Sequence, residues 1–301
     1  KSFSRVNKKM KRVFCIGNGE SRKGFDLETL RPKGKIYGCN AIYRDFNPDV
    51  LIAVDHGIMH EIYQSGYCYN NQTYFREWNR LPYQTFEMTI YGTMDKNEID
   101  NVKKWFNTFK MNERKEETEY VFHGVNLKGK ASIVKRYESD PKKHEILKKE
   151  INHTGIYVSW TRDDDKANNL SEIIKPKDRG WAAGSTSGLV ACLKEKPDEV
   201  YLIGHDLNSK DRLLNNIYKG TNCYAPAEQQ AIPSVNWINQ WSILFKEFRN
   251  TKFFKVNELV EDRQNGVYVD DLVNRPVLEW QGKTPNLSYI DYNELKRRLT
   301  L

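Results

Sequence analysis

The sequence predicts an α/β fold with a Rossmann-like, doubly wound and mostly parallel sheet, which a large central insertion interrupts. Two observations support this prediction. Three short apolar runs, each followed by a turn and a segment with helical spacing, occur within residues 13–64. The same alternation of strand-like and helix-like segments returns after residue 180.

The first apolar run, residues 13–16, leads directly into Gly17-Asn18-Gly19 and then Ser21. Apolar runs bounded by glycine are typical of buried strands, and glycines let backbone amides approach a ligand closely. We expect residues 22–30 to form a helix whose N-terminus faces this turn and favours an anion. The turn lacks the third glycine of the dinucleotide fingerprint and the Lys-Ser/Thr of a Walker A loop, so a plain strand-to-helix connection is an equally good interpretation.

Two further units follow. Residues 34–40 predict a strand that ends at Asn40, and residues 41–46 predict a turn or short helix. Residues 49–55 predict a strand buried on both faces that ends at Asp55-His56, before a helix over 58–64. Ligands of open α/β sheets bind at the carboxyl ends of the strands. We therefore expect these three strand ends to form one pocket.

The middle of the chain has a looser pattern. Residues 96–109 predict a helix, residues 128–150 are highly charged, and Asp163, Asp164 and Asp165 form an acidic run. Such a run can hold a divalent cation, but a solvated loop is the favoured interpretation. We predict four regions: residues 1–66 as the first half of the core, 67–178 as an insertion that contacts the acceptor, 179–257 as the second half, and 258–301 as a tail or lid ending in a basic helix.

The second half of the core begins with small residues, where Thr186, Ser187 and Gly188 open an apolar helix that we expect to point its N-terminus at a ligand. Residues 199–204 predict a buried strand followed by His205 and Asp206. A histidine at a strand end is more often structural than catalytic. A polar loop over 207–226, a helix over 237–248 and a strand over 253–257 complete this half.

The net charge of +8 favours a polyanionic partner or simply a solvated basic surface. The five cysteines lack the spacing of a metal site, which indicates reduced thiols in a cytoplasmic protein. No apolar run reaches the length of a membrane-spanning helix, and no signal peptide is evident, so we expect no membrane partner.

Four motifs occur in a characteristic order: Gly17-Asn18-Gly19-Glu20-Ser21 with Asp26 and Leu30 after it; Cys39-Asn40 with Tyr43; Thr186-Ser187-Gly188; and residues 200–206, Val-Tyr-Leu-Ile-Gly-His-Asp. This order resembles the bacterial sialyltransferases that use CMP-sialic acid, and the related motility accessory factors, over residues 11–65 and 180–257. The resemblance implies a variant GT-A-like glycosyltransferase fold. It also implies that a nucleotide-sugar donor binds at Gly17, Asn18, Gly19, Ser21, Asn40, Thr186, Ser187 and Gly188. In the family, two tyrosines six residues apart contact the phosphate, and Tyr218 and Tyr224 have this spacing.

The chain also departs from the family. A general-base histidine follows the second tyrosine there, whereas this chain has Ala227-Glu228-Gln229-Gln230. A glycosyltransferase must stabilise the departing phosphate, which helix N-termini and tyrosine hydroxyls can do without metal, and it must deprotonate an acceptor hydroxyl. We therefore expect no cofactor or metal, and we name Asp55, His56 and Asp206 as candidate bases, with Asp55 preferred.

The acceptor is open to several interpretations. Basic charge and abundant Tyr and Trp favour DNA, so we predict a phage enzyme that glycosylates hydroxymethylated pyrimidines in the host cytoplasm, with the aromatic segment 67–83 filling the gap left by a flipped base. One alternative is a sialyltransferase-like enzyme acting on glycans or proteins. Another is a pterin pyrophosphokinase that uses Mg²⁺ on the Asp residues. The third is a nucleotide- or nucleic-acid-binding module without activity. The sequence does not predict the oligomeric state.

Overall fold

The computed structural model describes residues 9–82, 109–111, 119–124, 156–175, 178–258, 263–264, 267–268 and 273–301. The chain divides into two compact units. The first unit comprises Lys1–Ile52 and Ile173–Leu301, and the second comprises Ala53–Glu172.

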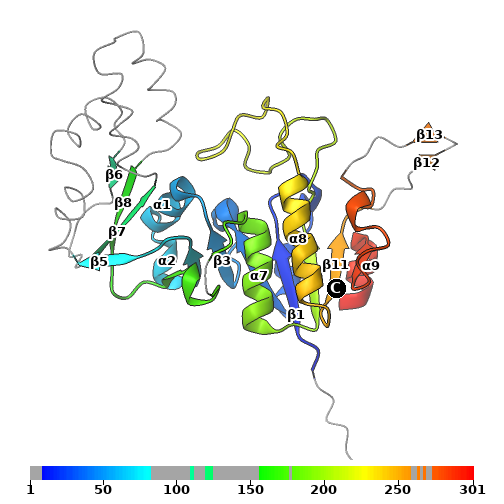
Figure 1. The fold of residues 1–301 in the computed structure, drawn as a ribbon, viewed down its shortest axis with the longest axis horizontal. Helices are drawn as coiled ribbons and strands as arrows, with labels where there is room; N and C mark the ends of the chain where they lie inside the picture. Colours follow the sequence, from blue (N-terminus) through cyan, green and yellow to red (C-terminus); the bar gives the residue numbers. More distant parts are fainter. Residues whose placement is uncertain are drawn as a thin grey trace, which may run out of the picture. The chain divides into compact units, whose positions relative to one another are not determined.

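The first unit is built on parallel strands that run in the order β14-β11-β10-β1-β2-β3 (Figure 1). These strands are β1 (Arg12–Ile16), β2 (Lys35–Cys39), β3 (Val50–Ala53), β10 (Glu199–Ile203), β11 (Lys252–Val256) and β14 (Leu287–Ile290). The chain thus builds outward from β1 in one direction and from β10 in the other, so the order reverses between these two strands. In open α/β sheets, ligands bind outside the carboxyl ends of the strands at such a reversal of the strand order. This arrangement confirms the predicted Rossmann-like α/β fold.

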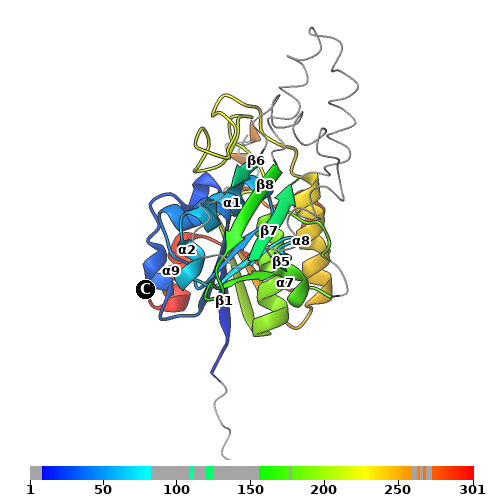
Figure 2. The ribbon, with the colours of Figure 1, turned by 90° about the vertical axis from the view of Figure 1, so that its left-hand side faces the viewer.

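Helices cover both faces of this sheet (Figure 2). On one face lie α7 (Ala183–Glu195) and α8 (Val235–Glu247), and on the other lies α9 (Tyr292–Leu299). The packing between α7 and α8 is close because Gly188 has no side chain: a Cβ there would lie 2.5 Å from a ring atom of Trp241. Trp241, Leu244 and Phe245 form the buried stripe of α8, as predicted.

The predicted helix over residues 22–30 is wrong. Two short 3₁₀ helices replace it, η1 (Glu20–Arg22) and η2 (Leu27–Leu30). Gly24 separates them with φ of +82°, a left-handed conformation that interrupts a helix. Asp26 then caps η2 by accepting a hydrogen bond from the N–H of Glu28. No long helix therefore presents its N-terminus to the turn after β1.

The C-terminal part of the first unit contains η6 (Leu278–Trp280), β14 and α9, besides a β12–β13 pair (Arg263–Gln264 and Val267–Tyr268). The basic helix at the end was predicted, but the strand β14 was not. Trp280 is buried and donates its Nε1–H to Ser242 Oγ over 2.7 Å, which holds this segment against α8. A substantial part of residues 273–301 thus belongs to the core of the first unit.

The second unit contains α1 (His56–Gln64), α2 (Tyr67–Asn70), η5 (Leu170–Glu172) and the parallel pair β4 (Thr73–Phe75) and β9 (Ala167–Asn169). A separate sheet has the order β5-β7-β8-β6, with bounds Arg80–Pro82, Glu119–Gly124, Ile156–Thr161 and Phe109–Met111. Of the predicted helix 96–109, residues 96–108 lie outside the described residues and Phe109 starts β6. The charged stretch 128–150 also lies outside them.

The acidic run belongs to this unit and serves its packing. The carboxylate of Asp165 is buried, pairs with Arg80 and accepts a hydrogen bond from the hydroxyl of Tyr63. Asp164 pairs with Arg162 over 3.0 Å. Within the residues that the structure describes, no group of three potential metal ligands gathers here or elsewhere. Asp165 is thus a buried structural carboxylate, unlike the solvated loop that was predicted, whereas Asp164 is exposed as predicted.

The cysteines follow the prediction of reduced thiols. Cys15, Cys39, Cys68 and Cys192 are buried, Cys223 is exposed, and none forms a disulfide. Burial raises the thiol pKa of Cys68 and of Cys192 to about 12. Among the described helices, none is long and apolar enough to cross a bilayer.

Candidate active site

The turn after β1 is held against the end of β10 by two backbone hydrogen bonds. The N–H of Gly17 donates to the carbonyl of Ile203, and the N–H of Gly19 donates to that of Gly204, both over 2.8 Å. A Cβ on Gly17 would lie 2.4 Å from the oxygen of Gly204, and a Cβ on Gly19 would lie 2.4 Å from the carboxyl carbon of Asp206. Both glycines therefore permit this close approach of two strand ends.

Arg22 organises this turn from inside. It is only 6% exposed, and its Nε donates to the carbonyl of Gly17 over 2.9 Å. Its Nη2 donates to the hydroxyl of Tyr218 over 3.1 Å and lies 3.5 Å from Asn18 Oδ1. The sequence analysis missed this residue, because arginine is a surface residue by default and its position after Ser21 was the only available signal.

Asn18 and Asn40 meet at the carboxyl ends of β1 and β2. Asn18 donates its Nδ2–H to the carbonyl of Cys39 over 3.0 Å, one residue before Asn40. Asn40 begins η3 (Asn40–Arg44) and has φ of +51°, a conformation that asparagine tolerates better than most residues. Its Oδ1 is buried and has no hydrogen-bond partner among the described residues. A buried acceptor without a donor is uncommon in proteins, and a water molecule or a ligand group can supply the missing donor.

Tyr218 and Tyr224 reach the same place from the loop after β10. Their ring centroids are 5.8 Å apart, and the guanidinium of Arg44 lies 5.8 Å from each ring. The hydroxyl of Tyr218 accepts from Arg22 and donates to Asp45. The hydroxyl of Tyr224 accepts from the N–H of Ala41 over 3.3 Å. Burial raises the pKa of both phenols, so both keep their protons at neutral pH.

Arg44 also fixes this loop directly. It donates to Thr221 Oγ1 over 2.7 Å and to the carbonyl of Asn222 over 2.9 Å. The structure thus brings together five of the residues that the sequence predicted for donor binding: Gly17, Asn18, Asn40, Tyr218 and Tyr224. It brings them together through two arginines that were not predicted, Arg22 and Arg44.

Asp206 and Ser21 lie beside this cluster. Asp206 is 5% exposed and accepts from the N–H of Ser21 over 3.0 Å, from the Ser21 hydroxyl, and from Asn215 Nδ2 over 3.0 Å. Burial lowers the pKa of the Lys255 ammonium to about 8, and the charge of Asp206 acts in the opposite direction by stabilising the protonated form. These contacts suit a carboxylate that holds the turn in place.

The small residues at the start of α7 lie in the interior. Thr186 and Ser187 are buried, and their hydroxyls donate to the carbonyls of Trp181, over 3.3 Å, and Gly184, over 2.6 Å. The local backbone thus already accepts from these two hydroxyls, and the role of Thr186, Ser187 and Gly188 in donor binding stays a prediction.

His205 lies in the same interior, against the ring of Trp241 at 5.1 Å between centroids. Burial, with a smaller contribution from the charge of Lys255, lowers its pKa to about 3. The imidazole is therefore neutral at ordinary pH and belongs to the core, as the sequence analysis favoured.

Asp55 and His56 belong to the second unit. Asp55 is exposed and occupies the N-cap position of α1, although its side chain makes no capping hydrogen bond. His56 is half-buried. Burial lowers the pKa of its imidazole, and this effect exceeds the opposite effect of the Glu77 and Asp55 charges, which raise it. Its Nε2 lies 4.0 Å from Glu77 Oε2.

Comparison with known proteins gives structural neighbours only. No family model matches the chain, and no curated protein matches it. The sialyltransferase CstII from Campylobacter jejuni, solved with a substrate analogue and cytidine-5′-monophosphate, is 14% identical, with 97% of this chain and 98% of that chain covered and a TM-score of 0.35. A structure of CST-II with a trisaccharide acceptor and CMP is 14% identical, with 96% and 99% covered and a TM-score of 0.34.

The monofunctional α-2,3-sialyltransferase Cst-I from Campylobacter jejuni is 12% identical, with 98% of this chain and 95% of that chain covered and a TM-score of 0.36. These neighbours are sialyltransferases, the family that the sequence motifs resemble. At such low identity and TM-score the similarity carries no argument about activity, which has to come from the residues of the site.

Proposed function

We propose that this protein is a nucleotide-sugar-dependent glycosyltransferase of the sialyltransferase-like type, which transfers a sugar to a hydroxyl group of a glycan. The observation that carries this proposal is the buried, unpaired Oδ1 of Asn40. It is held between Asn18, which binds the residue before it, and Tyr224, which binds the residue after it.

The amide oxygen of Asn40 fits the recognition of a nucleotide. It needs a hydrogen-bond donor, and a ribose hydroxyl or an exocyclic amino group of a base supplies one. Its left-handed backbone is constrained on both sides, so the oxygen is preorganised and loses little entropy when a nucleotide binds.

The two tyrosines have different roles in the departure of the nucleotide. The proton of the Tyr218 hydroxyl is directed at Asp45. The Tyr224 hydroxyl accepts from Ala41, and no described residue accepts its own proton. Tyr224 is therefore the residue that can donate to a phosphate oxygen as negative charge develops, while Tyr218 and Arg22 position it.

Of the candidate bases, Asp206 fits a positioning role better than proton abstraction. Its two oxygens already accept hydrogen bonds from Ser21 and Asn215, and proton transfer would compete with all of them. Asp55 and His56 are both at least partly accessible, and their role as the base stays a prediction from the sequence.

A glycan acceptor is better supported than DNA. In the aromatic segment that was expected to fill a gap in a duplex, Tyr74 and Trp78 are buried, and Trp78 packs against Tyr63 and Phe75 at 5.1 and 4.6 Å between centroids. The basic residues 142–149 lie outside the described residues. Modification of phage DNA therefore stays a prediction that the described residues do not support.

The nucleotide site is tested by thermal shift with CMP, UDP and GDP compounds against wild type and Asn40→Gly. Glycine adopts the left-handed backbone, so this variant removes only the amide. We expect one nucleotide to raise the melting temperature of the wild type and to lose that effect in the variant. Asn250→Gly, in the exposed turn after α8, is the matched control and should keep the shift. An unchanged shift in Asn40→Gly would place the nucleotide elsewhere.

The acceptor is tested by transfer from the nucleotide sugars that bind, followed by mass spectrometry of two acceptors. We expect a mass gain on a lactoside and none on DNA containing 5-hydroxymethylcytosine. A mass gain on DNA alone would favour DNA over a glycan as the acceptor. Nucleotide-sugar binding without any transfer would favour a binding module. Chelator should leave transfer intact, whereas loss of activity that Mg²⁺ restores would favour the pyrophosphokinase alternative.

A further inference from the structure

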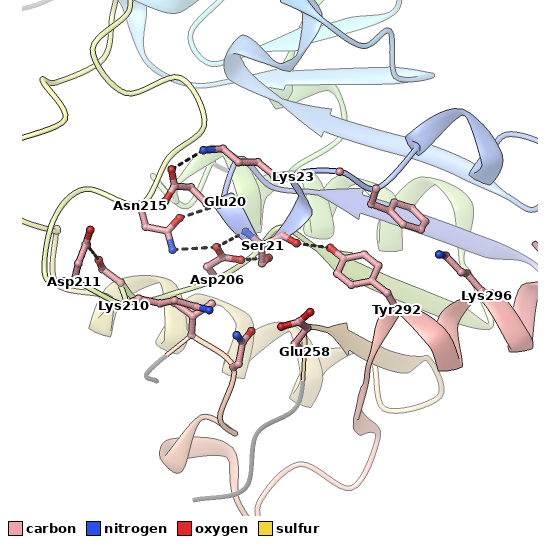
Figure 3. Close-up of a pocket in the computed structure, with 15 residues that line it drawn as sticks. Glu20, Ser21, Lys23, Asp206, Lys210, Asp211, Asn215, Glu258, Tyr292 and Lys296 are labelled. Atoms are coloured by element: carbon pink, nitrogen blue, oxygen red, sulfur yellow. Dashed lines mark hydrogen bonds and ion pairs between the residues drawn. The ribbon is translucent and has the colours of Figure 1, made fainter. Parts of the chain in front are cut away.

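A cavity of about 430 Å³ opens beside the turn after β1 (Figure 3). Its wall combines residues that follow β1, β10 and β11 with residues of α9. It shares Ser21 and Asp206 with the candidate active site, but Asn18, Asn40, Tyr218 and Tyr224 do not line it. Its volume lies within the range that small-molecule sites occupy, about 300–1,000 Å³.

Most of the acidic groups in this cavity are already engaged. Glu20 pairs with Lys23 over 2.9 Å and with Lys219 over 3.2 Å. Asp206 holds the turn, as described above. Asp211 accepts from Ser209 Oγ over 2.9 Å and from the N–H of Leu213 over 3.0 Å. These residues form a fixed polar wall rather than free charges.

Two opposite charges remain available. The side chains of Glu258 and Lys296 both line the cavity, and neither makes a hydrogen bond or ion pair with any residue that the structure describes. They do not pair with each other: Glu258 follows β11, Lys296 belongs to α9, and both are exposed to solvent. A ligand that satisfies both must present an anionic group to Lys296 and hydrogen-bond donors to Glu258.

An aromatic surface lies next to them. The rings of Phe25 and Tyr292 are 5.0 Å apart, tilted by 36°. The hydroxyl of Tyr292 donates to the carbonyl of Ser21 over 3.0 Å, so this ring has a fixed orientation. A fixed aromatic ring can pack against the C–H face of a sugar, whose hydroxyls point to the polar groups around it.

We propose that this cavity is a second binding site, for an acidic sugar of the uronic acid type. Its carboxylate binds Lys296, two neighbouring hydroxyls donate to the carboxylate of Glu258, and its ring lies against Tyr292. Carboxylates pair well with ammonium groups, and a carboxylate with two oxygens can accept two hydroxyl donors at once. The proposal concerns binding alone and does not depend on the proposed transfer reaction.

The test is an NMR titration of the full chain with methyl β-D-glucuronide and methyl β-D-glucoside, which differ only in the carboxylate. We expect the glucuronide to bind at least about tenfold more tightly than the glucoside, which corresponds to one charge-assisted contact. Lys296→Gln should remove this difference, and Glu258→Gln should weaken both sugars. Arg297→Gln is the control, since it removes a charge from the next residue of α9, whose side chain is 78% exposed and pairs with Glu294.

Three results would overturn the proposal. The first is no binding of either sugar, the second is equal affinity for both, and the third is an unchanged preference in Lys296→Gln. The titration is repeated with a saturating amount of whichever nucleotide binds in the thermal shift experiment. If the nucleotide displaces the glucuronide, the glucuronide occupies the nucleotide site. If Asn40→Gly loses nucleotide binding but keeps glucuronide binding, the two proposals can be judged independently.

Discussion

The turn after β1 and the first turns of α7 are both rich in glycine and small polar residues, and both lie in the first unit. Arg22 holds the turn, and beside it the Asn40 oxygen at the end of β2 and the Tyr224 proton in the loop after β10 have no partners among the described residues. In α7, the hydroxyls of Thr186 and Ser187 donate to the carbonyls of the preceding turn. The difference between the two regions is therefore whether the local backbone satisfies the polar side chains, and we propose that the unsatisfied groups beside the turn bind the nucleotide.

At neutral pH, the largest effect is expected from Arg22→Met. The substitution leaves the carbonyl of Gly17 and the hydroxyl of Tyr218 without their buried donor. We expect a loss of about 3 kcal/mol in the free energy of unfolding, measured in urea, and loss of the nucleotide-induced thermal shift. Lys23→Met is the control, because its surface pair with Glu20 should contribute less than about 1 kcal/mol. Equal effects of both variants would mean that Arg22 does not organise the turn.

The next effect is a dependence of the free energy of unfolding on pH, which is caused by His205 beside α7. His205 has a folded pKa of about 3, below the value of about 6.5 in an unfolded chain, so the unfolded state binds more protons between these values. The contribution to stability is complete above about pH 6.5 and is lost as pH falls towards 3, at up to about 1.4 kcal/mol per pH unit. Urea unfolding at several pH values should show this slope, and His205→Gln should reduce it. If the variant does not fold, the pKa of the His205 ring is measured by NMR titration of the wild type. A normal pKa would contradict the prediction.

A moderate effect is expected from Gly188→Ala. The new methyl group would lie 2.5 Å from Trp241, so α7 or α8 must shift. Overpacking costs about 1–3 kcal/mol, which exceeds the gain of about 1 kcal/mol in helix propensity. We expect lower stability with an unchanged nucleotide affinity. Lys194→Ala, on the exposed side of α7, should change neither.

The smallest effect is expected from Ser187→Ala. Loss of its hydrogen bond to Gly184 should cost about 1 kcal/mol, and the nucleotide affinity should stay within about twofold of the wild type. Calorimetric titration of the variant measures that affinity. A tenfold weaker affinity would restore the predicted role of Ser187 in donor binding and would remove the contrast between the two regions.

Much of the first unit could be predicted, because its strands are short apolar runs buried on both faces. β1, β2, β3, β10 and β11 lie where the alternation of apolar runs and glycine or asparagine placed them. β14 could not be predicted, since Leu-Ser-Tyr-Ile is too short and too polar to signal a strand without its neighbour β11.

The site could be predicted only in part, for a physical reason. Asn18, Asn40 and the two tyrosines carry recognisable spacing, whereas Arg22 acquires its role from contacts with residues far apart in the chain, such as Tyr218. The prediction of a helix over 22–30 failed because Arg22 is buried by contacts with distant residues and Gly24 adopts a left-handed conformation that interrupts the helix.

The exposure of Cys223 gives this protein a natural attachment point. The other four cysteines are buried, so a thiol-reactive fluorophore should label Cys223 selectively in the folded chain. A dye there would be one residue from Tyr224 and would report directly on ligands that enter beside it. Without a single substitution, the labelled protein would serve as an optical sensor for compounds that bind beside Tyr224, which opens it to screening of compound collections.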